Sequence, residues 1–154
     1  MTVQFEAALA GDADVLIAMA RVFHDEDGHM LGHDGEAAIR NALDGEPAAR
    51  VFVARDGGKT LGYVVVTTGY SIEYGGRDGF IDDFYVVPAA RGRGIGRAML
   101  AFAIREAARL GIRTLHLEVM PGNDPADRLY RSAGFEETGR RLMRLPLDSP
   151  NLGK

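Results

Sequence analysis

Hydrophobic and polar residues follow two different periods along this chain. Apolar residues that recur every three or four positions predict amphipathic helices, whereas alternation at every second position predicts half-buried strands. The helical period occurs at about residues 12–24, 35–43, 94–110 and 125–132. Strand-like patterns occur at about residues 3–7, 51–54, 61–68, 80–87 and 114–119, and one or two final strands are expected at 135–145.

Glycine and proline mark the ends of these elements. Asp56-Gly57-Gly58 is typical of a hairpin turn between two strands. Pro88 ends the strand before it, because proline has no N–H for a strand ladder. The resulting order is strand, two helices, a run of strands, then helix, strand, helix and strand. It combines an antiparallel meander with a parallel crossover, which predicts an α/β fold with a mixed sheet.

Length and composition restrict the function further. A chain of 154 residues predicts a single domain, which we place at residues 1–147, followed by a disordered tail at residues 148–154. No signal peptide pattern and no apolar run of about 20 residues is present, so a cytoplasmic protein without a membrane partner is expected. The absence of cysteine excludes disulfides and thiolate chemistry. A net charge of -4 does not favour a nucleic-acid partner.

The most informative stretch follows the strand that ends before Pro88. It reads Arg91-Gly92-Arg93-Gly94-Ile95-Gly96-Arg97 and leads into the strongest predicted helix. The first N–H groups of a helix have no intrahelical partner and carry partial positive charge, and glycines allow an anion to approach the backbone. The stretch therefore predicts a phosphate cradle. It lacks the Gly-Lys-Ser/Thr of a P-loop and the spacing of a dinucleotide fingerprint, and a solubilising glycine–arginine turn is the alternative.

This stretch resembles motif A of the GNAT acetyltransferase superfamily. The shared pattern is Arg91-x-x-Gly94-x-Gly96 after Phe84-Tyr85-Val86-Val87-Pro88, and in that family the backbone amides hold the pyrophosphate of acetyl-CoA. Downstream, Leu115 to Val119, Asn123 and Leu129-Tyr130-Arg131-Ser132-Ala133-Gly134-Phe135 resemble the second family motif, so the match covers residues 80–136. The resemblance implies a mostly antiparallel twisted sheet flanked by about four helices. It also implies acetyl-CoA as co-substrate, no metal, and a homodimer, which is common in the superfamily.

The resemblance assigns coenzyme contacts. Backbone groups of Tyr85, Val86 and Val87 would grip the pantetheine and the acetyl carbonyl, with the Val87 N–H as the expected oxyanion donor. The phosphate cradle would comprise Arg91, Gly92, Arg93, Gly94, Ile95, Gly96 and Arg97. Asn123 would bind the pantetheine arm, although it is also suited to cap a helix. Tyr130 would protonate the coenzyme sulfur as general acid; the alternative is a tyrosine that only packs against the sheet.

Three carboxylates compete for the role of general base. Ile81-Asp82-Asp83-Phe84-Tyr85-Val86 resembles the acidic strand of the diamine (spermidine/spermine) acetyltransferase branch, where the acidic pair helps to bind and deprotonate a polyamine. Neighbouring strand residues face opposite sides, so only one aspartate enters the cleft unless a bulge intervenes. Glu118 matches the glutamate that serves as base in the ribosomal-protein N-terminal branch. We rank Asp82 and Asp83 ahead of Glu118; solvated carboxylates are the alternative.

The acceptor is less well defined. The predicted loop from His24 to Asp34 could be an acidic funnel for a cationic amine, a metal site from His24, His29 and His33, or a solvated surface loop. We predict a small-molecule amine, preferably a cationic amine or polyamine. Aminoglycosides, a protein N-terminus or lysine, a non-catalytic acyl-CoA-binding regulatory module, and an unrelated nucleotide-binding domain are the alternatives.

Overall fold

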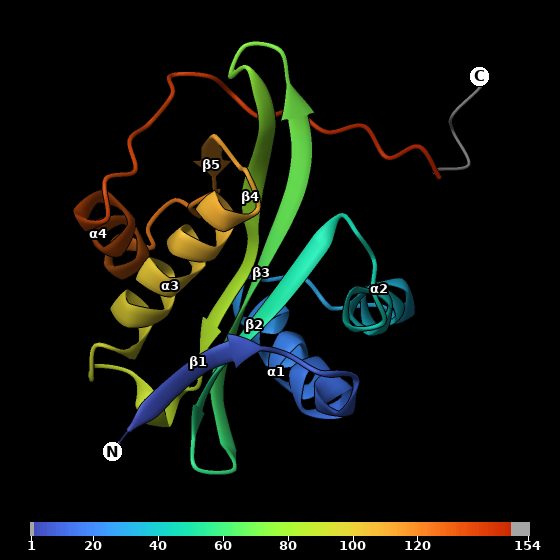
Figure 1. Cartoon of the computed structure of the whole chain (residues 1–154), viewed down its shortest axis with the longest axis vertical. Coiled ribbons are helices and arrows are strands. Elements are labelled where there is room, and N and C mark those ends of the chain that lie inside the picture. The colour runs from blue at the N-terminus through green and yellow to red at the C-terminus, as the bar shows by residue number, and fades with distance from the viewer. Residues whose placement is uncertain (1, 149–154) are drawn as a thin grey trace.

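A computed structural model describes residues 2–148 (Figure 1). One sheet contains five strands in the order β1-β2-β3-β4-β5. They are β1 (Val3–Ala7), β2 (Ala49–Asp56), β3 (Lys59–Ser71), β4 (Gly76–Val86) and β5 (Thr114–His116). The first four strands pair antiparallel, whereas β5 lies parallel to β4. The predicted mixed sheet, with a meander and one parallel crossover, is confirmed.

Helices cover both faces of this sheet. On one face lie α1 (Ala13–Glu26) and α2 (His33–Leu43), and on the other lie α3 (Ile95–Arg109) and α4 (Asp124–Ser132) (Figure 1). Short 3-10 turns at Ala10–Asp12 and Pro88–Ala90 precede α1 and the glycine-rich turn. Within residues 2–148, none of the helices combines the length and apolar character needed to cross a membrane.

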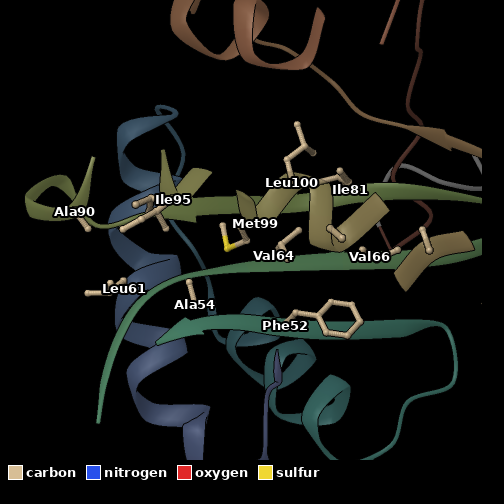
Figure 2. Packing of buried hydrophobic residues seen from close by; sticks show 13 residues of the cluster. Phe52, Ala54, Leu61, Val64, Val66, Ile81, Ala90, Ile95, Met99 and Leu100 are labelled. Carbon is tan, nitrogen blue, oxygen red and sulfur yellow. The ribbon is translucent and has the colours of Figure 1, made fainter. Parts of the chain in front are cut away.

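Two apolar clusters hold the helices against the sheet. On the α3 face, Met99 and Leu100 pack against Val64 and Val66 (Figure 2). On the α1 face, Tyr63 belongs to a separate cluster. Successive side chains of a strand point to opposite faces, so the continuous apolar run of β3 supplies both clusters.

The sheet opens between β4 and β5. β5 pairs only with the segment from Asp78 to Phe80, whereas β4 continues to Val86. The second half of β4 therefore has β3 on one side and no strand on the other, within the residues that the structure describes. Among the described residues, this opening leaves backbone groups in the second half of β4 without a strand partner on the β5 side.

The predicted strands at the end of the chain are wrong. The strand expected at residues 114–119 ends at His116, and no helix or strand occurs between residues 133 and 148. β5 offers only a short edge, and Pro146 could not donate to a ladder. The segment instead runs extended past the β3–β4 turn, where Arg140 pairs with Glu73 (Figure 1). Residues 149–154 of the predicted tail lie outside the described residues.

Candidate active site

A cleft of about 790 Å³ lies at the opening between β4 and β5. Its walls come from the end of α1 and the residues after it, the second half of β4, the glycine-rich turn with the start of α3, the segment after β5, and α4. The predicted site residues that line it are Asp82, Asp83, Tyr85, Val86, Arg91, Gly92, Gly96, Glu118, Asn123 and Tyr130. The fold therefore brings together all three candidate bases and the candidate acid. Val87, Arg93, Gly94, Ile95 and Arg97 lie beside the cleft rather than in its lining.

The glycine-rich turn has the backbone conformation that a phosphate cradle requires. Gly92 and Gly94 adopt φ values of +77° and +79°, in the left-handed region that favours glycine. Gly94 is the N-cap of α3, and no side chain caps this helix end. The first amides of a fifteen-residue helix therefore remain available for an anion.

Arg91 contacts other residues of the protein around the cradle. Its Nε donates to the Val86 carbonyl at 2.8 Å, and its guanidinium lies over the Tyr85 ring, 5.5 Å from the centroid. It also pairs with Glu26 at 3.3 Å. These contacts tie the cradle to β4 and α1, whereas Arg97 is exposed on the first turn of α3.

The expected oxyanion donor must be corrected. The Val87 N–H donates to the Leu61 carbonyl at 2.9 Å, so it is not available to a ligand. Amides of successive strand residues point to opposite sides, which directs the Val86 N–H toward the open side of β4. The Val86 carbonyl agrees with this direction, because it accepts the hydrogen bond from Arg91.

A bulge places two adjacent carboxylates in the cleft. Val65 lies opposite Asp83, but Val66 lies opposite Ile81, so Asp82 is the extra residue of β4. Asp83 is buried, and its Oδ2 accepts a 2.8 Å hydrogen bond from the Tyr63 hydroxyl. Burial and the Asp83 charge raise the pKa of Tyr63 far above its ordinary value, so the phenol remains a donor.

Asp82 has a different environment. Solvent reaches its side chain, but the walls of the cleft partly desolvate it. This desolvation, together with the charges of Asp83 and Glu118, raises the pKa of Asp82, and His24 opposes the shift. Three carboxylates in one cleft repel one another, and a bound cation would relieve that repulsion.

Two histidines that the sequence pattern placed in a loop belong to this site. α1 continues to Glu26, which puts His24 on its last turn. His24 Nε2 lies 3.0 Å from Asp83 Oδ2, and His24 Nδ1 lies 3.2 Å from His29 Nε2. Fifty-nine positions separate His24 from Asp83, so no local pattern could have indicated this pair. Among residues 2–148, no group of three or more potential metal ligands is assembled, and His33 instead begins α2.

Tyr130 and Asn123 lie on the opposite wall. The Tyr130 ring packs edge-on against Phe84 and Phe135, with 6.1 Å between centroids in each pair. Burial, and secondarily the Asp27 charge, raises the pKa of Tyr130, which keeps the phenol protonated at neutral pH. The Asn123 side chain accepts a 3.3 Å hydrogen bond from the Ala126 N–H, so it caps α4 while lining the cleft.

The open sheet, the uncapped helix start and the cleft with acid and base candidates define a coenzyme-dependent acyltransferase. The sequence matches the acetyltransferase (GNAT) family over residues 16–135. The chain belongs to this family and is an N-acetyltransferase with acetyl-CoA as co-substrate.

Known relatives agree with the family. Aminoglycoside N(6')-acetyltransferase type 1 from Stenotrophomonas maltophilia is 32% identical over 117 residues, covering 73% of this chain and 76% of that protein. Streptothricin acetyltransferase from Streptomyces lavendulae is 34% identical over 143 residues, covering 88% and 69%. The crystal structure of integron cassette protein HFX_CASS3, from the mobile metagenome of Cole Harbour Salt Marsh, has a TM-score of 0.82 and 38% identity, covering 96% of this chain and 92% of that one.

Proposed function

We propose that the chain acetylates a small molecule carrying several cationic amines. The observation that carries this proposal is the acidic cleft, in which Asp82, Asp83 and Glu118 are joined by Glu26 and Asp27. A negatively charged cleft with low-dielectric walls attracts and concentrates cations. The raised pKa of Asp82 supports the same conclusion, because part of its cause is mutual repulsion between carboxylates.

The relatives support a cationic acceptor in general terms. One is named for an aminoglycoside and another for streptothricin. The strand resemblance instead pointed to a diamine or polyamine. These compounds share several ammonium groups on a small framework, which is the chemistry that the cleft would recognise.

The proposed mechanism is direct transfer within a ternary complex. Asp82 holds the ammonium group, and after deprotonation the nitrogen lone pair attacks the acetyl carbon. The Val86 N–H stabilises the developing oxyanion, because it faces the open side of β4. The C–S bond then breaks, the thiolate takes the phenolic proton of Tyr130, and a nitrogen proton restores that phenol. The amides at the start of α3 hold the pyrophosphate.

Acetyl-CoA turnover with different acceptors tests the proposal. Thiol release would be measured with diamines, polyamines, aminoglycosides, streptothricin-type compounds, amino acids and short peptides. The proposal expects the highest kcat/KM among the polycationic small molecules. Turnover with peptides alone would contradict the acceptor class, and acetyl-CoA binding without turnover on any acceptor would favour a regulatory module.

Tyr130→Phe tests the general acid. We expect kcat to fall roughly 100-fold, while the KM for acetyl-CoA changes little, because the hydroxyl acts only in the transition state. Tyr70→Phe is the matched control, since Tyr70 is 76% exposed and does not line the cleft. An unchanged kcat in Tyr130→Phe would exclude Tyr130 as the acid.

A further inference from the structure

We propose that His29, supported by His24 and Asp83, accepts the proton of the acceptor's ammonium group. The inference rests on the proposed function, because only a cationic acceptor carries this proton to the site. It assigns deprotonation to a histidine pair and leaves Asp82 to bind the charge. These three residues, which we call the relay, all line the acceptor cleft.

The hydrogen bonds determine which nitrogen is free. An ionised carboxylate only accepts, so the contact between Asp83 Oδ2 and His24 Nε2 makes that nitrogen the donor. In neutral His24, Nδ1 must then accept from His29 Nε2, 3.2 Å away. The proton of neutral His29 is therefore on Nε2, and its Nδ1 carries a free lone pair. The relay Asp83–His24–His29 thus ends in a basic nitrogen.

Neighbouring side chains hold the relay residues in place. The Tyr63 hydroxyl donates to Asp83, which fixes the carboxylate at the buried end of the relay. The His24 ring packs edge-on against Phe23 at 5.2 Å and against His29 at 5.1 Å between centroids. Exposure increases from the buried to the accepting end, from 10% for the Asp83 side chain to 20% for the His24 side chain, and His29 is exposed. The accepting end therefore reaches both substrate and solvent.

The proton transfers balance without another reactant. His29 Nδ1 takes the ammonium proton, directly or through one water, and His29 Nε2 passes its proton to His24 Nδ1. The positive charge then lies on His24, beside the Asp83 carboxylate that stabilises it. The reverse shift returns the proton to the exposed ring of His29 and then to water after transfer. A base oriented by a second group that is held by a third follows the general logic of activated catalytic groups.

An imidazole is better suited to this step than Asp82. Its ordinary pKa of about 6.5 lies nearer to neutral pH than that of an aspartate, at about 3.9. Several charged or titratable groups line the same cleft as the pair or contact it through Asp83. They are Asp82, Asp83, Tyr63, Glu26, Asp27 and Arg91.

The test compares His29→Gln with His33→Gln in the full chain. His33 is exposed at the start of α2 and outside the cleft lining, so it is a matched control. At pH 7 we expect His29→Gln to lower kcat/KM for the amine roughly 100-fold, with the KM for acetyl-CoA and the melting temperature unchanged. The deficit should diminish as the pH approaches the pKa of the amine, because the acceptor is then already neutral.

Imidazole rescue provides a second measurement. His29→Gly should regain activity when free imidazole is added, whereas His33→Gly should show no response. His24→Gln should show the same pH-dependent deficit, but it also removes a contact with buried Asp83, so the exposed His29 variants decide the question. If the wild type acetylates the amine and His29→Gln is equally active, the relay is wrong and the proposed function stands. The same holds if the activity deficit of His29→Gln is equal at every pH. Absence of amine acetylation by the wild type would instead refute the proposed function.

Discussion

Asp82 and Asp83 are neighbours in sequence but lie in different environments. Asp83 is buried and its Oδ2 contacts both Tyr63 and His24, so it is suited to orient other groups. Asp82 is the extra residue of the bulge and is reached by solvent in the cleft. The bulge therefore separates an anchoring carboxylate from one that can meet a substrate.

Replacing Asp82 should affect binding and stability in opposite directions. Because the folded-state pKa of Asp82 is raised, the fold favours its protonated form, and this stabilisation is lost as the pH rises through the folded pKa. Asp82→Asn should therefore raise the melting temperature at pH 7 and leave it unchanged near pH 3, below the unfolded pKa of about 3.9. The KM for a cationic acceptor should rise roughly tenfold, equivalent to about 1.4 kcal/mol.

Thermal unfolding at both pH values and steady-state kinetics would check this prediction. Asp44→Asn also removes one negative charge, but from an exposed position after α2 and outside the cleft lining, so it controls for net charge. A lower melting temperature for Asp82→Asn at pH 7 would show that the carboxylate stabilises the fold.

At the residue scale, sequence reasoning succeeded where the signal was local. Asp82, Asp83, Glu118 and Tyr130 were predicted together and line one cleft. Their catalytic roles stay predictions. The expected role of the Val87 N–H was wrong, because the direction of a strand amide depends on the pairing with β3, which no local motif encodes.

At the element scale, the glycine-rich turn and α3 have the conformation that the predicted cradle needs, and phosphate binding there stays a prediction. Gly94 has a left-handed backbone, for which an alanine costs about 1–2 kcal/mol. Gly94→Ala should therefore destabilise the fold by about 1 kcal/mol or shift the turn, and weaken acetyl-CoA binding several-fold in either case. Calorimetry with acetyl-CoA and denaturant unfolding would measure the two effects.

Gly11→Ala is the control for this glycine substitution. No neighbouring atom lies within 4 Å of a Cβ added at Gly11, and its φ is not in the positive range. If both variants bound acetyl-CoA as tightly as the wild type, the left-handed conformation at Gly94 would not be needed for the cradle.

Helices and strands differed in how far the sequence could predict them. The apolar stripe of α3 is a local property, and the helix was found almost as expected. One or two strands were also expected near the end of the chain, but a strand requires a partner. β5 presents only three residues, and the segment from 139 to 148 pairs with no strand among the described residues.

Exposed apolar side chains occur in series near the end of the described chain. Its terminal segment carries Leu142, Met143, Leu145 and Leu147, which are 68%, 86%, 71% and 79% exposed. Clustered exposed apolar side chains mark interaction surfaces more often than isolated ones do. A groove of about 490 Å³ also lies beside β5, between α3 and the residues after α4.

The exposed terminal segment and the groove beside β5 could pair between two copies of the protein. The groove is lined by apolar side chains of Ile104, Ile112, Leu115, Leu117 and Phe135. The terminal segment passes the β3–β4 turn, where Arg140 pairs with Glu73 (Figure 1). We expect the segment of a second copy to cover the groove, and a twofold axis would repeat the exchange. The homodimer implied by the family resemblance would then have a physical basis.

Light scattering over a range of concentrations would determine the oligomeric state. The double variant Met143→Glu, Leu145→Glu should be monomeric, because it places two charges in an apolar contact. Its kcat should stay near the wild-type value, since neither residue lines the active-site cleft. Leu9→Glu, at a residue 69% exposed before α1, should leave the dimer intact. A wild-type protein that is monomeric at every concentration would contradict the exchange, and the segment would then have to cover apolar surface within its own chain.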